Sequence, residues 1–215
     1  MKNEKLSCLR VFFCSLLLLL SAVSVPAQQS KSNADALRRI STAASQMCSM
    51  QCDFVQTKHM KMLNETLTAR GHMYYQQADK LRWEYTSPYQ YTFIMNGQRV
   101  LLDSGRRRDV IDVNQSKIFR EIARIMMSSV TGSSLSDTRD FRATVATTQK
   151  EYVATLTPQR REMKQMFQRV VLHFNRQTAT ITEVEIVEKK GDRTVIELRN
   201  VKKNQTVDAR LFTIR

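Results

Sequence analysis

Apolar and polar residues alternate along most of the chain, and this period of two predicts a protein built mainly of β-strands. The short predicted strands follow one another through short turns, which is typical of an antiparallel meander and not of βαβ units. Asn96-Gly97 and Gly191-Asp192 are the clearest hairpin turns. The predicted strands span residues 52–60, 66–77, 79–87, 89–97, 98–104, 106–114, 141–148, 151–158, 168–176, 179–189, 193–201 and 207–214.

Two longer stretches show the spacing of amphipathic helices instead. The first covers residues 34–48, with Ser32 or Asn33 available as its N-cap. The second covers residues 115–130 and ends before Gly132, a residue suited to stop a helix. A short basic segment, 159–167, also carries apolar residues at helical spacing. The apolar positions are Leu37, Ile40, Ala44 and Met47 in the first helix, Ile118, Ile122, Ile125 and Met126 in the second, and Met163, Met166 and Phe167 in the short segment.

So many strands, with two or three helices, predict an α+β fold that is mainly β. A flat sheet of that width would expose long edges, so we expect a curled, barrel-like sheet. Each helix has a single apolar stripe to bury, and the helices should therefore cover one face of the sheet.

Residues 1–27 have the order of a secretory signal peptide. Lys2, Lys5 and Arg10 precede an apolar run at 11–25, and small residues follow as far as Ala27. Cleavage after Ala27 would leave a single exported domain, residues 28–215. No cysteine stands at this point, so we expect a soluble protein without a lipid anchor.

The chain is strongly basic, with a net charge of +14, of which +2 lies in residues 1–27 and +12 in the rest. Such a charge suits nucleic acid, an anionic membrane surface or an acidic partner, and export makes nucleic acid the least expected of the three. The run Arg106-Arg107-Arg108 follows Gly105 in a predicted turn. We interpret it as a solvated loop, with docking to an anionic membrane or acidic protein as the alternative.

Candidate catalytic or metal-binding groups are scattered. His59, His72 and His173 fall on separate predicted strands, and no zinc-protease or nucleophile-elbow motif is present. After the signal only Cys48 and Cys52 remain, a spacing that gives weak evidence for metal. We interpret the two cysteines as small apolar side chains at a helix-to-strand corner, with a disulfide between them as the alternative. We therefore expect no enzyme, no cofactor and no metal.

Aromatic residues gather in one part of the chain. Seven of the sixteen aromatic residues lie between Tyr74 and Phe93, and the chain also holds eleven methionines. Strand alternation places Leu81, Trp83 and Tyr85 on one face. For most proteins such a cluster is ordinary core, but methionine and tyrosine also suit a surface that adapts to an apolar ligand.

Several segments together resemble the LolA-like carriers, which are periplasmic chaperones of outer-membrane lipoproteins. They are "CDFVQTK" (52–58), Gly71-x-Met73-Tyr74-Tyr75, "LRWEYTSP" (81–88), the Asn96-Gly97 turn, "ATLTPQRREMKQMFQRVVLHF" (154–174), the Gly191-Asp192 hairpin and "ARLFTI" (209–214). The resemblance implies an incomplete antiparallel barrel of about eleven strands, with helices as a lid over an apolar cavity.

The resemblance also implies a function and partners. The cavity would take up the acyl chains of lipoproteins received from an inner-membrane ABC-type release complex and passed to an outer-membrane acceptor. We expect a monomer that binds no nucleic acid, with a regulatory protein sensing lipid or lipoprotein through the same half-barrel as the alternative. The predicted lipid-binding residues are Phe54, Met73, Tyr75, Leu81, Trp83, Tyr85, Phe93, Met95, Ile122 and Met126.

One position departs from the family pattern. Members often carry an Arg-Pro pair after the glycine-containing strand, and the arginine latches the lid. This chain has Gln76-Gln77-Ala78-Asp79 there, with a glutamine in place of the arginine. Control of the lid must differ accordingly.

Overall fold

The computed structural model describes residues 26–115, 135 and 141–214. The chain divides into two units, Met1–Ser32 and Asn33–Arg215, and the sheet belongs entirely to the second. The elements are α2 (Pro26–Ser45), β1 (Ser49–Met60), β2 (Glu65–Gln76), β3 (Lys80–Ser87), β4 (Tyr91–Asn96), β5 (Arg99–Asp103), β6 (Arg108–Asp112), η1 (Val113–Gln115), β7 (Phe141–Thr147), β8 (Glu151–Pro158), α4 (Arg161–Met166), β9 (Phe167–Asn175), β10 (Ile181–Glu188), β11 (Arg193–Lys203) and η3 (Ala209–Phe212).

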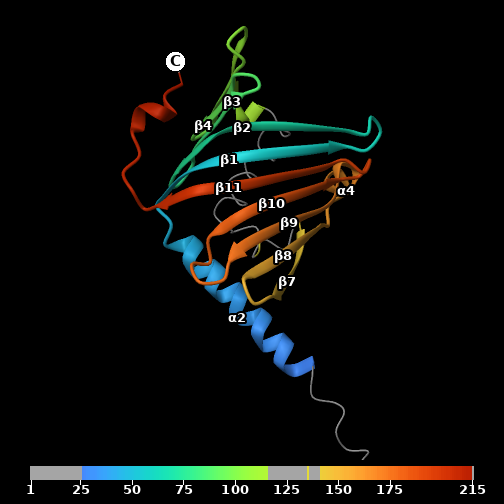
Figure 1. Ribbon diagram of the computed structural model, residues 1–215. Helices are drawn as coiled ribbons and strands as arrows, with labels where there is room; N and C mark the ends of the chain where they lie inside the picture. Colours follow the sequence, from blue (N-terminus) through green and yellow to red (C-terminus); the bar gives the residue numbers. More distant parts are fainter. Residues whose placement is uncertain (1–25, 116–134, 136–140, 215) are drawn as a thin grey trace, which may run out of the picture. The chain divides into compact units, whose positions relative to one another are not determined.

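The eleven strands form one antiparallel sheet in the order β6-β5-β4-β3-β2-β1-β11-β10-β9-β8-β7 (Figure 1). β1 is central, with the strands that follow it directly on one side and the strands of the second half of the chain on the other. β6 and β7 form the two edges and do not pair with each other, so the sheet is open. The predicted mainly β fold with an incomplete antiparallel barrel is confirmed.

The inner face of the sheet carries one continuous core. It joins buried residues of β1–β5, such as Leu81, to those of β8–β10, such as Leu172. Within residues 33–45, α2 buries Ala36 and Ile40 in this core, as its apolar stripe predicts. The helix ends at Ser45, three residues earlier than predicted.

α2 also makes a polar contact with the sheet. The Arg39 guanidinium Nη1 donates to the Tyr152 hydroxyl of β8 at 3.1 Å. Between the helix and the β9–β10 turn there remains a cavity of about 10 Å³, which is about the minimum that one water molecule needs. The helix is therefore closely packed on this half of the sheet.

The outer face of β4 and β5 is covered by the C-terminal segment. The prediction of a strand at 207–214 is wrong: the segment leaves the sheet after Lys203 and forms the short helix η3. The Asn96 amide donates to the Phe212 carbonyl at 3.1 Å, and Arg82 Nη1 donates to the Leu211 carbonyl at 3.3 Å. A second apolar cluster results, made of Ile94, Leu101, Val207 and Phe212, with Tyr74, Leu211 and Ile214 at its margin.

The second predicted helix falls largely outside the described residues. Only Gln115 is described, as the end of η1, and Ile122 and Met126 are not. Leu135, from the predicted loop that follows, is 4% exposed and lies in the core. The short basic segment contains the predicted helix, α4, with Met163 buried, whereas Phe167 already belongs to β9. No helix in the described ranges is both long enough and apolar enough to cross a membrane.

Truncation of Phe212 tests whether the C-terminal segment stabilises the sheet. The side chain is fully buried against Ile94 and Leu101, so Phe212→Ala should lower the free energy of unfolding by about 3 kcal/mol. Urea unfolding followed by circular dichroism measures the change. Arg210→Ala, on the exposed side of η3, is the matched control and should have little effect. Equal stability of Phe212→Ala and the wild type would contradict a fixed segment.

Candidate functional site

Strand register places the predicted site residues in three rows on the inner face of β1–β5. The first row is Met50, Tyr75, Leu81, Met95 and Val100; the second is Cys52, Met73, Trp83, Phe93 and Leu102; the third is Phe54, Gly71, Tyr85 and Tyr91. Neighbours in a row are direct cross-strand pairs, which bring their side chains into contact. The structure thus gathers eight of the ten predicted residues, Phe54, Met73, Tyr75, Leu81, Trp83, Tyr85, Phe93 and Met95, into one apolar surface.

Gly71 makes the third row possible. A Cβ at this position would lie 1.8 Å from the Glu84 carbonyl oxygen and 2.8 Å from Cζ of Phe54. The β2–β3 register shifts at the same place, between Arg70 and Gly71. With no side chain on β2, the Phe54 ring extends across the strand toward β3.

The aromatic rings that meet over Gly71 form a contiguous group. Phe54 lies 4.5 Å from Trp83 and 5.2 Å from Tyr85, measured between ring centroids, and the second contact is edge-on. Tyr85 in turn lies 5.4 Å from Tyr89 and 6.4 Å from Tyr91. Such offset and edge-on pairs are favourable beyond the area that they bury.

Two polar groups lie among these rings. The Tyr85 hydroxyl donates to Gln56 Oε1 at 2.9 Å, and burial raises its pKa to about 12, so it stays a neutral donor. The Trp83 indole N–H is enclosed and has no hydrogen-bond partner of good geometry among the described residues, although it lies close enough to the Tyr85 hydroxyl to lower that group's pKa slightly.

The surface also includes residues that the sequence reasoning did not name as site residues. Val100 and Leu102 of β5 complete the first two rows, and Cys52 begins the second. Alternation in the predicted strand 98–104 already placed Val100 and Leu102 on a common face. What alternation lacked was the register that sets β5 against Phe93 and Met95.

The two cysteines lie in different environments. Both are free thiols, so the alternative of a disulfide is wrong. The favoured interpretation holds for Cys52, which is buried, and fails for Cys48, which is exposed. Burial, helped by the nearby Asp53 carboxylate, raises the pKa of the Cys52 thiol to about 12.

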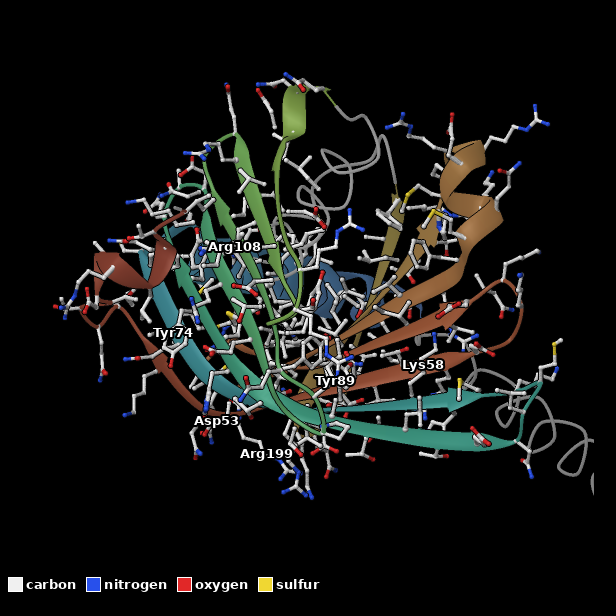
Figure 2. The ribbon with its side chains drawn as sticks, turned by 90° about the horizontal axis from the view of Figure 1, so that it is seen from above. Asp53, Lys58, Tyr74, Tyr89, Arg108 and Arg199 are labelled. Atoms are coloured by element: carbon white, nitrogen blue, oxygen red, sulfur yellow. The ribbon has the colours of Figure 1, made fainter. Side chains whose placement is uncertain are left out.

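The outer face of β1 and β2 carries a polar cluster. His72 Nδ1 lies 2.7 Å from Asp53 Oδ1, and the Asn200 amide donates to Asp53 Oδ2 at 2.7 Å. These hydrogen bonds, from Asn200 first and then His72, lower the pKa of the Asp53 carboxyl. Figure 2 shows Asp53 on the outer side of the strands. Across the described ranges, no group of three or more His, Cys, Asp and Glu side chains could hold a metal ion.

The other basic and polar features have local partners. Arg107 pairs with Asp109 at 2.7 Å, in the turn after Gly105, as expected for a solvated loop. Gln77, where the family pattern has arginine, is exposed, and its backbone N–H donates to the Cys48 carbonyl at 2.8 Å. The turn between β2 and β3 thus contacts the corner between α2 and β1.

Comparison with known proteins identifies the family. Residues 45–215 match the profile described as "Outer membrane lipoprotein carrier protein LolA". The chain belongs to the LolA family. Two relatives named outer-membrane lipoprotein carrier protein, from the Corby and Lens strains of Legionella pneumophila, are 24% and 25% identical to it. The alignments cover 86% and 85% of this chain and 87% and 85% of the relatives.

Solved structures share the fold at low sequence identity. The MucA/MucB complex of Pseudomonas aeruginosa matches this LolA-family chain with a TM-score of 0.52 at 13% identity, and a structure of MucB matches with a TM-score of 0.51 at 13% identity. Each match covers 86% of this chain but only 61% and 63% of the other. The likeness extends to the fold alone.

Addition of a single methyl group at Gly71 tests the packing of the aromatic rows. Gly71→Ala places a Cβ against a backbone carbonyl, which cannot move without shifting β3. We expect a loss of about 2–3 kcal/mol in unfolding free energy and a changed Trp83 emission spectrum, because the Phe54–Trp83 contact is disturbed. Gly105→Ala, where nothing lies within 4 Å, is the control. It should cost about 1 kcal/mol, from its positive φ, and leave the emission unchanged.

Thiol labelling tests the positions of the two cysteines. The thiolate is the reacting form, so the buried Cys52 should resist a maleimide in the folded mature protein while the exposed Cys48 reacts. Peptide mass spectrometry after labelling assigns the modified residue, and labelling in urea should modify both. Equal native rates at the two sites would mean that the inner face is open to solvent at Cys52.

Proposed function

We propose that the mature chain is a periplasmic carrier that holds the acyl chains of lipoproteins against the inner face of β1–β5 and takes them from the inner to the outer membrane. The observation that carries the proposal is the gathering of aromatic and methionine side chains into three aligned rows. Membership of the LolA family supports a lipoprotein as the cargo. The proposed partners are an inner-membrane ABC-type release complex and an outer-membrane acceptor, with the carrier a monomer.

The chemistry required is burial and release, without a covalent step. Each CH₂ removed from water contributes about 0.8 kcal/mol. Much of the rows is already covered: Phe54, Met73 and Leu81 are at most 1% exposed, whereas Trp83, Tyr85 and Tyr91 are partly buried. An acyl chain must therefore replace contacts that the protein makes with itself. The net affinity is then the difference between the contacts that the acyl chain makes and the protein's own contacts that it replaces. Because these two contributions are similar, the cargo can be released as well as bound.

The residues to be displaced come from two segments. Ala36 and Ile40 of α2 and the isolated Leu135 share the core with the three rows. Movement of these segments would open the inner face, as a lid does. Ile122 and Met126, in the segment before Leu135, remain proposed members of that lid.

A sensor of lipid or lipoprotein is the second candidate. MucB has this fold and has been solved in complex with MucA. A carrier and a sensor would use the same apolar surface and differ in the step after binding. Transfer of the bound lipopeptide to vesicles or to an acceptor is expected of a carrier only.

Adjacent residues on opposite faces of β4 give a matched test of the binding surface. Phe93 belongs to the inner rows and Ile94 to the outer cluster, and both are buried. Phe93→Ala and Ile94→Ala should destabilise the protein by similar amounts, about 2–4 kcal/mol each. Only Phe93→Ala should weaken binding of a diacylated lipopeptide, by about tenfold, because it removes apolar contact with the acyl chains.

Emission from Trp83, the only tryptophan, follows the titration. Unacylated peptide of the same sequence is the ligand control. If the wild type shows no saturable response to the lipopeptide, or if both variants weaken binding equally, the inner face is ordinary core and the proposal fails.

A further inference from the structure

The tip of the β1–β2 hairpin presents apolar side chains to solvent. Met62, Leu63 and Leu67, here called the apolar tip, are 89%, 62% and 54% exposed. Met166 of α4 is 50% exposed. These four are the majority of the six large apolar residues that are exposed in the described part of the chain. Isolated exposed leucines are common on protein surfaces, but a cluster at a protruding turn indicates a contact.

Three neighbouring segments meet at this tip. The Lys61 backbone N–H donates to Asp192 Oδ1 at 3.1 Å, and the Lys61 stem passes so close to Gly191 that a Cβ there would lie 2.7 Å from its Cδ. On the other side of the β10–β11 turn, the Lys189 N–H donates to the Met166 carbonyl at 2.9 Å. The hairpin tip, the β10–β11 turn and α4 therefore form one continuous surface.

Cations surround the apolar side chains. Lys61, Lys164, Lys189 and Lys190 are all exposed. Lys189 and Lys190 form no ion pair within the described ranges.

The acids of this region are largely engaged with other groups. Lys58 lies 2.9 Å from Glu188 and 4.0 Å from Asp192, and Arg193 pairs with Glu185 at 2.9 Å. Figure 2 shows Lys58 on the strands behind the tip. Glu65 on the hairpin and Glu162 on α4 are exposed acids, and Glu162 lies 4.0 Å from Arg160. The surface that remains is apolar at its centre and positive around it.

We propose that the apolar tip inserts into an anionic phospholipid surface, with the surrounding lysines at the level of the headgroups. Apolar side chains flanked by Lys are the pattern of interfacial membrane contacts, and each cation near an anionic leaflet adds to the attraction. A protein partner is less suited, because lysine is depleted at protein–protein interfaces and their strongest contacts come from Trp, Tyr and Arg in pockets. The tip is a convex turn of Met, Leu and Lys.

One residue of the apolar tip, Leu67, lies on the same side of the sheet as the inner rows, opposite Lys58 of β1. Every second residue of β2 faces the same side of the sheet, and this set consists of Leu67, Ala69, Gly71, Met73 and Tyr75. An acyl chain leaving the rows could follow this side of β2 toward the bilayer. That route rests on the proposed function, whereas insertion of the tip does not.

Vesicle co-sedimentation of the mature protein tests the insertion. Vesicles of phosphatidylethanolamine and phosphatidylglycerol at about 3:1 should bind the protein, and phosphatidylcholine vesicles should bind it at least about tenfold more weakly. Met62→Ser/Leu63→Ser and Lys189→Gln/Lys190→Gln should each reduce binding by about tenfold or more, and about 0.5 M salt should abolish most of it. Val110→Ser is the control for loss of an exposed apolar side chain, and Arg106→Gln/Arg107→Gln is the control for loss of charge. Neither control should change vesicle binding.

A relocated tryptophan reports insertion directly. In a Trp83→Phe background, Leu63→Trp should shift its emission to the blue on the anionic vesicles and be quenched by brominated lipid. The Met62→Ser/Leu63→Ser variant should bind lipopeptide at the inner face as the wild type does. Vesicle binding and lipopeptide binding are therefore separate measurements, and a failure of the proposed cargo binding would not contradict insertion of the apolar tip. Absence of vesicle binding, dependence on Arg106 and Arg107 instead, or a tryptophan that stays in water would each overturn it. If the apolar tip contacts a protein instead, the Met62→Ser/Leu63→Ser variant would lose a partner protein and still bind vesicles, which would also overturn the proposal.

Discussion

The close approach of β3 to β2 at Gly71 is the constraint on which the inner face depends. Because the Glu84 carbonyl occupies the space where a Cβ would be, β2 has a bare position in the middle of an apolar row. Phe54 fills that position from the neighbouring strand and thereby contacts both Trp83 and Tyr85. One missing side chain thus converts three separate strands into a single aromatic surface.

β4 and β5, which contribute to the inner rows, are also apolar on their outer face. β4 carries Phe93 toward the inner rows and Ile94 toward the outer face, and both are buried. A strand that buries both faces needs a cover on each, and the C-terminal segment with Phe212 supplies the outer one. In the proposed carrier, the inner face would exchange its own covering for a ligand while the outer packing holds β4 and β5 in place. In the proposed carrier, the outer face is thus the fixed one and the inner face the exchangeable one.

Alternation along the sequence predicted eleven of the strands, and it placed Leu81, Trp83 and Tyr85 on one face, where they also lie in the structure. The same reasoning failed at 207–214. Val207, Ala209, Leu211 and Thr213 occupy every second position there, as they would on one face of a strand. A strand needs a partner, and after Asn204, which adopts a positive φ and accepts from the Cys48 N–H, the chain turns away from β1. Pairing of this kind is a tertiary property, and local periodicity cannot report it. The exposure of Met62 and Leu63 could not be predicted for a similar reason, because both lie between two predicted strands, where alternation gives no information on what a residue contacts.

The packing of the inner rows limits how a carrier of this design can work. An empty cavity of acyl-chain size would lose the dispersion contacts of its lining, and apolar voids destabilise proteins in proportion to their volume. A surface that covers itself avoids that loss, but in the proposed carrier each ligand would have to compete with the buried residues that share its core, Ile40 and Leu135 among them. Methionine lowers the barrier to such exchange, since its unbranched side chain repacks with little strain. In the proposed carrier, cargo affinity would therefore depend as much on the segments that leave the inner face as on the rows that receive the lipid.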